Sequence, residues 1–201
     1  MAFIKTVVHA EAQGPVAEVY DEIERRVGYL PNWAQAFSLR PEVWRAWDGL
    51  INAIRARLTV REYELAALAA AKALRSSYCA LAHGRVLAEK VFDGPTVTAI
   101  VTNSASAPLT PAERVMMSFV EKIVDSADRI SQDDVAALRK HGYTDEAIFD
   151  IAAAAAARCF FSKLLDAIGA QPDAVYRDLM TAELCESLTV GRPLASAGAP
   201  D

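Results

Sequence analysis

The chain of 201 residues carries 26 acidic and 21 basic side chains, giving a formal net charge of −5, and 53% of its residues are hydrophobic. This length and composition suffice for a buried core in one or two domains. The lack of a basic surplus argues against partners that present phosphate, either nucleic acid or an anionic membrane surface. Three cysteines without a repeating spacing argue against a disulfide framework and favour a reducing compartment.

Neither targeting nor metal binding is indicated by the sequence. The N-terminal apolar run is too short for a secretory signal, and no stretch is long enough to cross a bilayer. No metal-ligand cluster accompanies the cysteines, so we expect neither a metal nor another cofactor. The sequence therefore predicts a cytoplasmic protein.

Helical periodicity dominates the first part of the chain. Residues 11–27 predict a helix that ends at Gly28. A second run of apolar residues at helical intervals extends over residues 33–54, with a new helix starting at Pro41. Aromatic side chains at this spacing usually pack in a core, and a substrate pocket is the alternative.

Two consecutive helices are predicted after residue 59. Thr59 and Glu62 have the spacing of a capping box, which predicts a helix over about residues 60–74. Ser76 and Ser77 interrupt this run, and both are residue types that cap a new helix. The next helix therefore starts near Ser77.

These two helices carry a candidate catalytic group of three residues. Cys79 lies in the first turn of the second helix, where unpaired amides and the helix dipole favour a thiolate. His83 follows one turn later on the same face, close enough to share a proton with the sulfur directly or through a water. Glu64 lies on the preceding helix, which a short turn folds back, so that its carboxylate can orient the imidazole. Without this context, a cysteine in an alanine-rich helix is more often an inert core residue.

The order Glu64, Ser76-Ser77-Tyr78-Cys79 and His83 resembles the signature of the alkylhydroperoxidase D and carboxymuconolactone decarboxylase superfamily, especially its peroxidase-related branch. In that family a glutamate precedes a Cys-x-x-Cys motif by one helix, and a histidine follows the second cysteine at the spacing seen here. The resemblance extends over about residues 14–179. Ser76 stands where the family has its first cysteine, and a hydroxyl cannot form the disulfide of a dithiol cycle.

The resemblance implies a multi-helix, all-α fold like that of alkylhydroperoxidase D and a homo-oligomer, either a trimer or a hexamer. It also implies a thiol peroxidase that reduces a peroxide at Cys79, assisted in proton transfer by Glu64 and His83, with an external thiol as reductant. In that interpretation Ser76 belongs to the catalytic set. Three aromatic residues become candidates for the substrate pocket: Trp33, Phe37 and Tyr78.

Two other functions stay open. The first is a non-redox decarboxylase or isomerase of the same superfamily that uses His83 and Glu64 as acid and base. The second is a structural or binding descendant that has lost turnover through Ser76. Consumption of peroxide distinguishes the thiol peroxidase from both.

The second half of the chain is also helical. Residues 95–102 have the β-branched content of a strand, but a lone strand would be unpaired, so we predict a short helix. Residues 103–108 are predicted to form a loop between the halves. Further helices are predicted from capping signals at residues 111–126, from Ser131 to His141-Gly142, and from Thr144 to about residue 168.

Residues 148–165 are nearly apolar all round and predict a helix that is buried centrally or at a subunit interface. Cys159 within it is interpreted as structural, and Cys185 as a free thiol. A faint echo between residues 58–62 and 109–113 suggests two similar halves, about 1–105 and 106–182, within one domain over residues 1–182. Residues 183–201 are rich in Gly, Pro, Ser and Ala and predict a disordered tail.

Overall fold

The computed structural model describes residues 2–103 and 105–196, and all regular secondary structure within them is helical. The helices are, in chain order, η1 (His9–Glu11), α1 (Pro15–Val27), α2 (Asn32–Ala36), α3 (Pro41–Arg55), α4 (Val60–Ala73), α5 (Ser77–Lys90), α6 (Gly94–Thr102), α7 (Pro111–Ser126), η2 (Ala127–Arg129), α8 (Gln132–Lys140), α9 (Asp145–Ala167), α10 (Tyr176–Leu179) and α11 (Ala182–Leu188). The two η elements are 3-10 helices. The predicted all-α class is confirmed.

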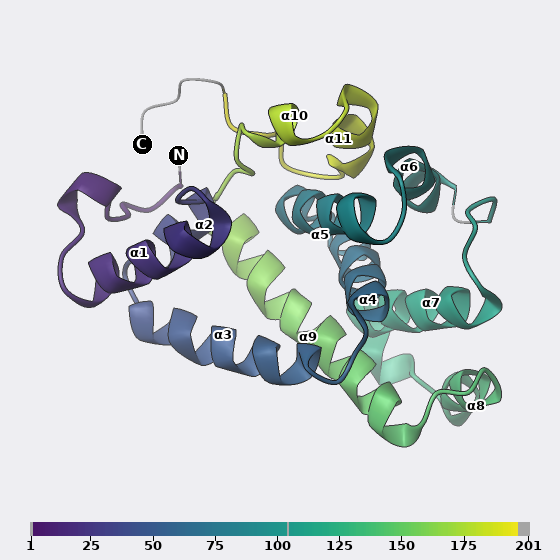
Figure 1. Cartoon of the computed structure of the whole chain (residues 1–201). Helices are drawn as coiled ribbons and strands as arrows, with labels where there is room; N and C mark the ends of the chain where they lie inside the picture. Colours follow the sequence, from purple (N-terminus) through teal and green to yellow (C-terminus); the bar gives the residue numbers. More distant parts are fainter. Residues whose placement is uncertain (1, 104, 197–201) are drawn as a thin grey trace.

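Helix α4 lies at the centre of the fold because no face of it is left for solvent. Every residue from Tyr63 to Ala71 is buried, and most of them are alanine or leucine, whose small or flexible side chains let neighbouring helices approach closely. It packs against α5, α7 and α9. Figure 1 shows α9 crossing the molecule diagonally, with α3 on one side and α4 and α7 on the other.

The capping signals place most helix starts correctly. Thr59 and Thr110 each accept a hydrogen bond from the glutamate three residues later, and that glutamate bonds back to the cap, so both capping boxes form. Ser131 forms a third box, with Asp134. The β-branched segment is a helix, α6, as predicted. The first long helix, however, begins at Pro15 instead of residue 11, because Gly14 adopts a positive φ of 53° just before it.

The predicted disordered tail is wrong for residues 183–196. Residues 182–188 form α11, which packs against α5 and α6 and buries both Leu188 and Cys185. Leu194 is also buried. The Gly, Pro and Ser content that suggested disorder belongs to short connections between these buried leucines. The last part of the predicted tail, residues 197–201, lies outside the described residues.

The segment after α11 packs tightly against the start of α5, and this gives a prediction. The Gly191 N–H donates to Ser77 Oγ at 2.7 Å, and a Cβ on Gly191 would lie 1.8 Å from the carbonyl oxygen of Arg75. Gly191→Ala is therefore expected to lower the free energy of unfolding by about 1–3 kcal/mol, as for other overpacked sites. Urea denaturation measures this change.

The matched control for that substitution is Gly49→Ala within α3. A Cβ there meets no atom within 4 Å. Because glycine weakens a helix interior, Gly49→Ala is expected to raise stability by about 0.5–1 kcal/mol. Equal stability of the Gly191→Ala protein and the parent would show that the segment after α11 is not held against α5.

Within one copy of the chain, α9 is not buried on all sides, so central burial does not hold, and burial at a subunit interface stays a prediction. Its inner face is buried, but Phe149 and Phe160 on its outer face are 71% and 46% exposed. Cys159 is partly buried, and its interpretation as a structural residue stays a prediction. The buried face also includes two polar residues, Arg158 and Ser162. In the part of the chain that the structure describes, no helix is long and apolar enough to cross a membrane.

Candidate active site

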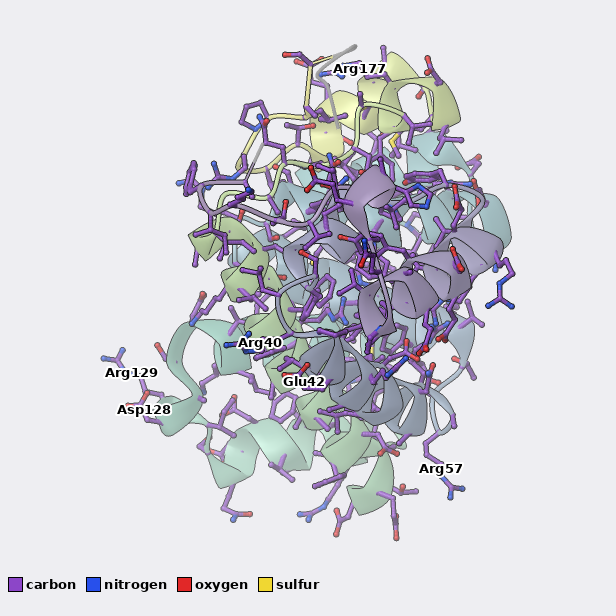
Figure 2. The ribbon with its side chains drawn as sticks, turned by 90° about the vertical axis from the view of Figure 1, so that its left-hand side faces the viewer. Arg40, Glu42, Arg57, Asp128, Arg129 and Arg177 are labelled. Atoms are coloured by element: carbon purple, nitrogen blue, oxygen red, sulfur yellow. The ribbon has the colours of Figure 1, made fainter. Side chains whose placement is uncertain are left out.

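Charged side chains such as those of Arg57, Asp128 and Arg129 project outward from the molecule in Figure 2. A few are instead buried, and two of these, Glu64 and Arg158, gather around the start of α5. Buried charges are rare unless they are paired or serve chemistry. The candidate active site therefore lies along α5, where these buried charges meet.

Cys79 is the third residue of α5 and is 2% exposed. Its position in the first helical turn agrees with the prediction from the serine pair. Ser76 occupies the N-cap position, but its side chain caps nothing, contrary to expectation, and it is fully buried. The Ser76 hydroxyl makes no hydrogen bond of good geometry within the described residues.

The structure brings Glu64 and His83 together. Arg75 takes a left-handed φ of 54° between α4 and α5, and the two helices pack against each other. Glu64 Oε2 consequently lies 2.6 Å from His83 Nδ1, with the Glu64 side chain buried and the His83 side chain 12% exposed. The expected pairing of these two residues is thus present, while their catalytic roles remain predictions.

Helix α9 supplies two side chains that the sequence analysis missed. Arg158 Nη1 lies 2.9 Å from His83 Nε2, and the Ser162 hydroxyl donates to Cys79 Sγ at 3.0 Å. Among the described residues no hydrogen bond joins Cys79 to His83, so the expected direct sharing of a proton between them is not seen. The sulfur is instead held by Ser162.

The polar residues of α9 that face α5 are regularly spaced. Arg158, Ser162 and Asp166 are each four residues apart and therefore lie on one face of α9. They lie next to His83, Cys79 and Ser76 in turn. Burial raises the pKa of Asp166, and the Ser76 hydroxyl acts to lower it; the contact between them is electrostatic without a well-formed hydrogen bond.

The contacts of His83 determine where its proton lies. A guanidinium only donates hydrogen bonds, so His83 Nε2 must be the acceptor for Arg158. The neutral ring then carries its proton on Nδ1, and this N–H donates a hydrogen bond to Glu64. Burial lowers the pKa of His83, Glu64 opposes this, and the positive charge of Arg158 adds to the lowering. The ring is therefore held in its neutral form with the base nitrogen covered by Arg158.

This lowered pKa predicts a dependence of stability on pH. The unfolded chain protonates His83 near its ordinary value of 6.5, whereas the folded chain does so only at lower pH. Between the two values the unfolded state binds more protons, so the free energy of unfolding falls as the pH is lowered below 6.5. Urea denaturation at several pH values, in a background with His9→Asn and His141→Asn, measures the slope. His83→Asn should remove it; an unchanged slope would contradict the assignment.

Aromatic rings surround the guanidinium of Arg158. Its Cζ lies 4.9 Å from the ring centroid of Trp47 and 5.2 Å from that of Phe161. Two of the three predicted pocket residues, Phe37 and Trp33, contact Phe161, with ring centroids 5.6 and 6.0 Å apart. Phe161 therefore lies between them and Arg158. Trp47 thus lies closer to the polar residues than either of them.

Tyr78, the third predicted pocket residue, points into a separate network. Its hydroxyl donates to Asp173 at 2.5 Å and accepts the backbone N–H of Trp33 at 3.0 Å. Asp173 also accepts from the Tyr29 hydroxyl and from the backbone N–H of Asn32, while burial raises its pKa. This network ties the segment before α10 to α2 and adjoins the site through Tyr78, the residue before Cys79.

Two cavities lie near these networks. One of about 280 Å³ lies between α3 and α4 and is lined by Asn52, Arg55, Tyr63 and Glu64 among others, so it reaches the carboxylate of the site. A larger one, of about 570 Å³, is lined in part by Asp173 and the N-terminal segment, and neither cavity is lined by Cys79 or His83. We regard the smaller cavity as the relevant one because it contacts Glu64. Within residues 2–103 and 105–196, no group of three metal-ligating side chains is present.

The fold and the site define a helical protein of the alkylhydroperoxidase D type. Residues 41–122, which include Glu64, Cys79 and His83, match the model of the carboxymuconolactone decarboxylase family. The matched residues are those that carry the motif on which the sequence resemblance to the superfamily rests. None of the curated proteins compared with the sequence matches it.

Solved structures of similar fold agree with this assignment. The alkylhydroperoxidase AhpD core, an uncharacterized peroxidase-related protein from Ralstonia eutropha JMP134, is 26% identical with a TM-score of 0.76, covering 87% of this chain and 94% of that one. An uncharacterized peroxidase-related protein from Silicibacter sp. TM1040 is 25% identical with a TM-score of 0.75, covering 85% and 93%. The debrominase Bmp8, seen in complex with 2,3,4-tribromopyrrole, is 21% identical with a TM-score of 0.72, covering 87% and 94%, and shares the fold.

Proposed function

We propose that the protein is a thiol-dependent peroxidase that works with one catalytic cysteine, Cys79, and an external thiol. The observation that carries the proposal is the environment of the sulfur. Cys79 lies in the first turn of α5, where the helix dipole favours an anion, and receives a hydrogen bond from Ser162. Both features stabilise negative charge on the sulfur. The similarity to two peroxidase-related proteins supports the same chemistry.

The proposed reaction oxidises the sulfur by two electrons. The Cys79 thiolate attacks the terminal oxygen of a hydroperoxide, an S–O bond forms and the O–O bond breaks. The sulfur becomes a sulfenic acid, and the other oxygen leaves as an alkoxide that takes up the proton lost by the thiol. An external thiol then condenses with the sulfenic acid, releasing water and forming a mixed disulfide. A second thiol reopens it and restores Cys79.

His83 and Glu64 are assigned the handling of that proton. The Nε2 atom of His83 becomes available to the thiol proton when Arg158 moves away from it, and Glu64 then faces the positive charge of the imidazolium. The decarboxylase or isomerase alternative is less well supported, because it makes no use of the sulfur that lies at the start of α5 and accepts a hydrogen bond from Ser162. Peroxide reduction starts at the sulfur, which Arg158 leaves uncovered.

Mass spectrometry of the protein after stoichiometric hydrogen peroxide tests this function. The peptide containing Cys79 is expected to gain one oxygen or to form a mixed disulfide with added thiol, and steady-state peroxide consumption should require that thiol. Cys79→Ser should abolish both. Cys159→Ser is the matched control and should change neither, because burial raises the pKa of Cys159 and keeps it protonated. Peroxide consumption that survives in Cys79→Ser would refute the proposal.

We also propose a closed homo-oligomer, trimeric or hexameric as the resemblance implies. Phe149 and Phe160 expose apolar rings on the outer face of α9, and such rings are commonly covered by another copy. Light scattering at micromolar concentration is expected to give a multiple of the 21.7 kDa chain mass. Replacing both phenylalanines by glutamate should reduce that mass to the monomer value. Ala136→Glu, which places the same charge on an exposed position of α8, should not.

A further inference from the structure

The environment of Arg158 contains more hydrogen-bond donors than acceptors. The side chain is 3% exposed, and of its three nitrogens only Nη1 has a partner, His83. Its Nε and Nη2 atoms are buried and unpaired within the described residues. The indole Nε1 of Trp47, whose ring lies against the guanidinium, is buried and unpaired as well.

Such unpaired donors are unfavourable. A buried polar group without a partner costs about 1–3 kcal/mol, and more when it is charged. Arg158 has no ion pair with any described acidic residue, and Glu64 is bound instead to His83. Trp47 and Phe161 contribute cation–π contacts, but these leave the N–H groups unbonded. The protein therefore keeps a buried cation whose natural complement, an anion with oxygen acceptors, is not supplied by residues 2–103 or 105–196.

The geometry of the free atoms narrows the choice of anion. Nε and Nη2 form one edge of the guanidinium, the fork that binds both oxygens of a carboxylate side by side. A single water could accept from these donors but would leave the positive charge unpaired. The nearby aromatic rings fit an organic body better than a small hydrated ion. A carboxylate satisfies the fork, the charge and the apolar surroundings together.

We infer that the Nε–Nη2 edge of Arg158, with Trp47 Nε1 beside it, binds the carboxylate of the substrate, which on the proposed function is a small hydroperoxide carrying a carboxylate. Ser162, the residue that bonds to Cys79, lies one turn beyond Arg158, a rise of about 6 Å along α9. The carboxylate and the peroxide of such a substrate are therefore separated by only a few atoms.

The same contact connects substrate binding to the base. An anion at the Nε–Nη2 edge attracts the guanidinium, whose Nη1 is bound to His83. When Arg158 turns toward the anion, His83 Nε2 loses its donor and becomes able to accept the proton of Cys79. Because the free donors are covered, the ligand must displace side chains on its way in. The cavity lined by Arg55, Tyr63 and Glu64 adjoins the Glu64–His83 pair.

Isothermal titration calorimetry on the Cys79→Ser protein tests the inference without peroxide chemistry. Benzoate serves as the probe, and benzamide, which has the same shape without the charge, is its control. Benzoate is expected to bind about tenfold or more tightly than benzamide, because a paired, desolvated charge contributes more than a neutral hydrogen bond. Equal affinities, or no detectable binding of either, would overturn the inference.

Substitutions then locate the binding. Arg158→Met should abolish the preference for benzoate, and Arg158→Lys, which keeps the charge without the fork, should retain only part of it. Trp47→Phe keeps an aromatic ring while removing one donor, so it should weaken benzoate binding severalfold. This variant also tests the site if the Arg158 variants do not fold. Arg26→Met is the matched control, because Arg26 also lies over a tryptophan, Trp44, but is already paired with Asp48, and its loss should not alter benzoate binding.

The outcomes separate this inference from the proposed function. If Cys79 of the parent protein is oxidised by peroxide but Cys79→Ser protein shows no preference for benzoate, only the carboxylate site is refuted. If benzoate binds through Arg158 but peroxide never oxidises Cys79, the site stands and the peroxidase function falls. Benzoate binding that is unchanged in Arg158→Met would place the anion elsewhere and reject the inference.

Discussion

Glu64→Gln is expected to reduce the rate of peroxide reduction by about 10²–10⁴-fold, the range that a positioned acid–base group usually contributes. Protonation of His83 creates a second positive charge near Arg158, whose Nη1 lies 2.9 Å from the ring before it moves away. The Glu64 carboxylate, 2.6 Å away on the opposite ring nitrogen, is the group that offsets it. An amide keeps the hydrogen-bond acceptor for Nδ1 but removes the negative charge. The ring should therefore stay in place while losing its ability to accept a proton.

Steady-state peroxide consumption with excess external thiol, measured against pH, tests this expectation. The pH at which activity rises should also change, because the carboxylate raises the pKa of His83 against the effect of burial. Glu113→Gln is the matched control. Glu113 is equally a buried glutamate at a helix start and is paired with Arg61, but it lies on α7 away from Cys79. Its loss should lower stability and leave the rate unchanged. Similar rates for Glu64→Gln and the parent would exclude Glu64 from the reaction.

The parts of the site that the sequence predicted are those determined by local rules. Cys79 and His83 lie four residues apart on one helix, and the capping box at Thr59 locates the preceding helix on which Glu64 lies. Because the connection between these two apolar helices is short, they pack against each other. The pairing of Glu64 with His83 follows from these short-range signals.

The residues that the sequence analysis missed come from far along the chain. Arg158 and Ser162 lie 75 and 83 positions beyond their partners, and no local pattern states which helix will face α5. The available signal was the spacing of Arg158, Ser162 and Asp166 at every fourth position in an otherwise apolar helix. The overall hydrophobicity of α9 concealed this spacing, because the alanines and phenylalanines on the other faces made the whole helix look apolar.

The tail was misjudged for a related reason. Composition indicates whether an isolated segment tends to be disordered, but residues 182–196 make tertiary contacts with the rest of the protein. Leu184 and Leu188 find a surface on α5 and α6, and the glycine at 191 permits close approach to the carbonyl of Arg75. Tertiary contacts of this kind override local propensity, and they cannot be seen until the neighbouring helices are placed.

Ser76→Cys is expected to convert the site into a dithiol. Position 76 is the N-cap of α5 and position 79 lies in its first turn, so the two side chains belong to one helical start. The Ser76 hydroxyl is buried without a well-formed hydrogen bond, so a thiol can replace it without losing one. After peroxide oxidises Cys79, the new thiol attacks the sulfenic acid, water leaves and an intramolecular disulfide forms. Turnover with a dithiol reductant should rise about tenfold or more, because the resolving thiol no longer has to diffuse to the site.

Intact-protein mass spectrometry after one equivalent of peroxide should show the loss of two hydrogens in Ser76→Cys and not in the parent. Ser77→Cys is the control that separates position from composition. Ser77→Cys adds a cysteine to the same buried turn, at the residue whose hydroxyl accepts a hydrogen bond from Gly191. Positions 77 and 79, however, are two residues apart on a helix and so do not face each other. Cys159 and Cys185 belong to other helices and are present in every variant, so a disulfide through either would appear in the parent as well. If Ser76→Cys and Ser77→Cys behave alike, position 76 is not adjacent to the sulfur of Cys79, and the one-cysteine interpretation of the motif loses its structural basis.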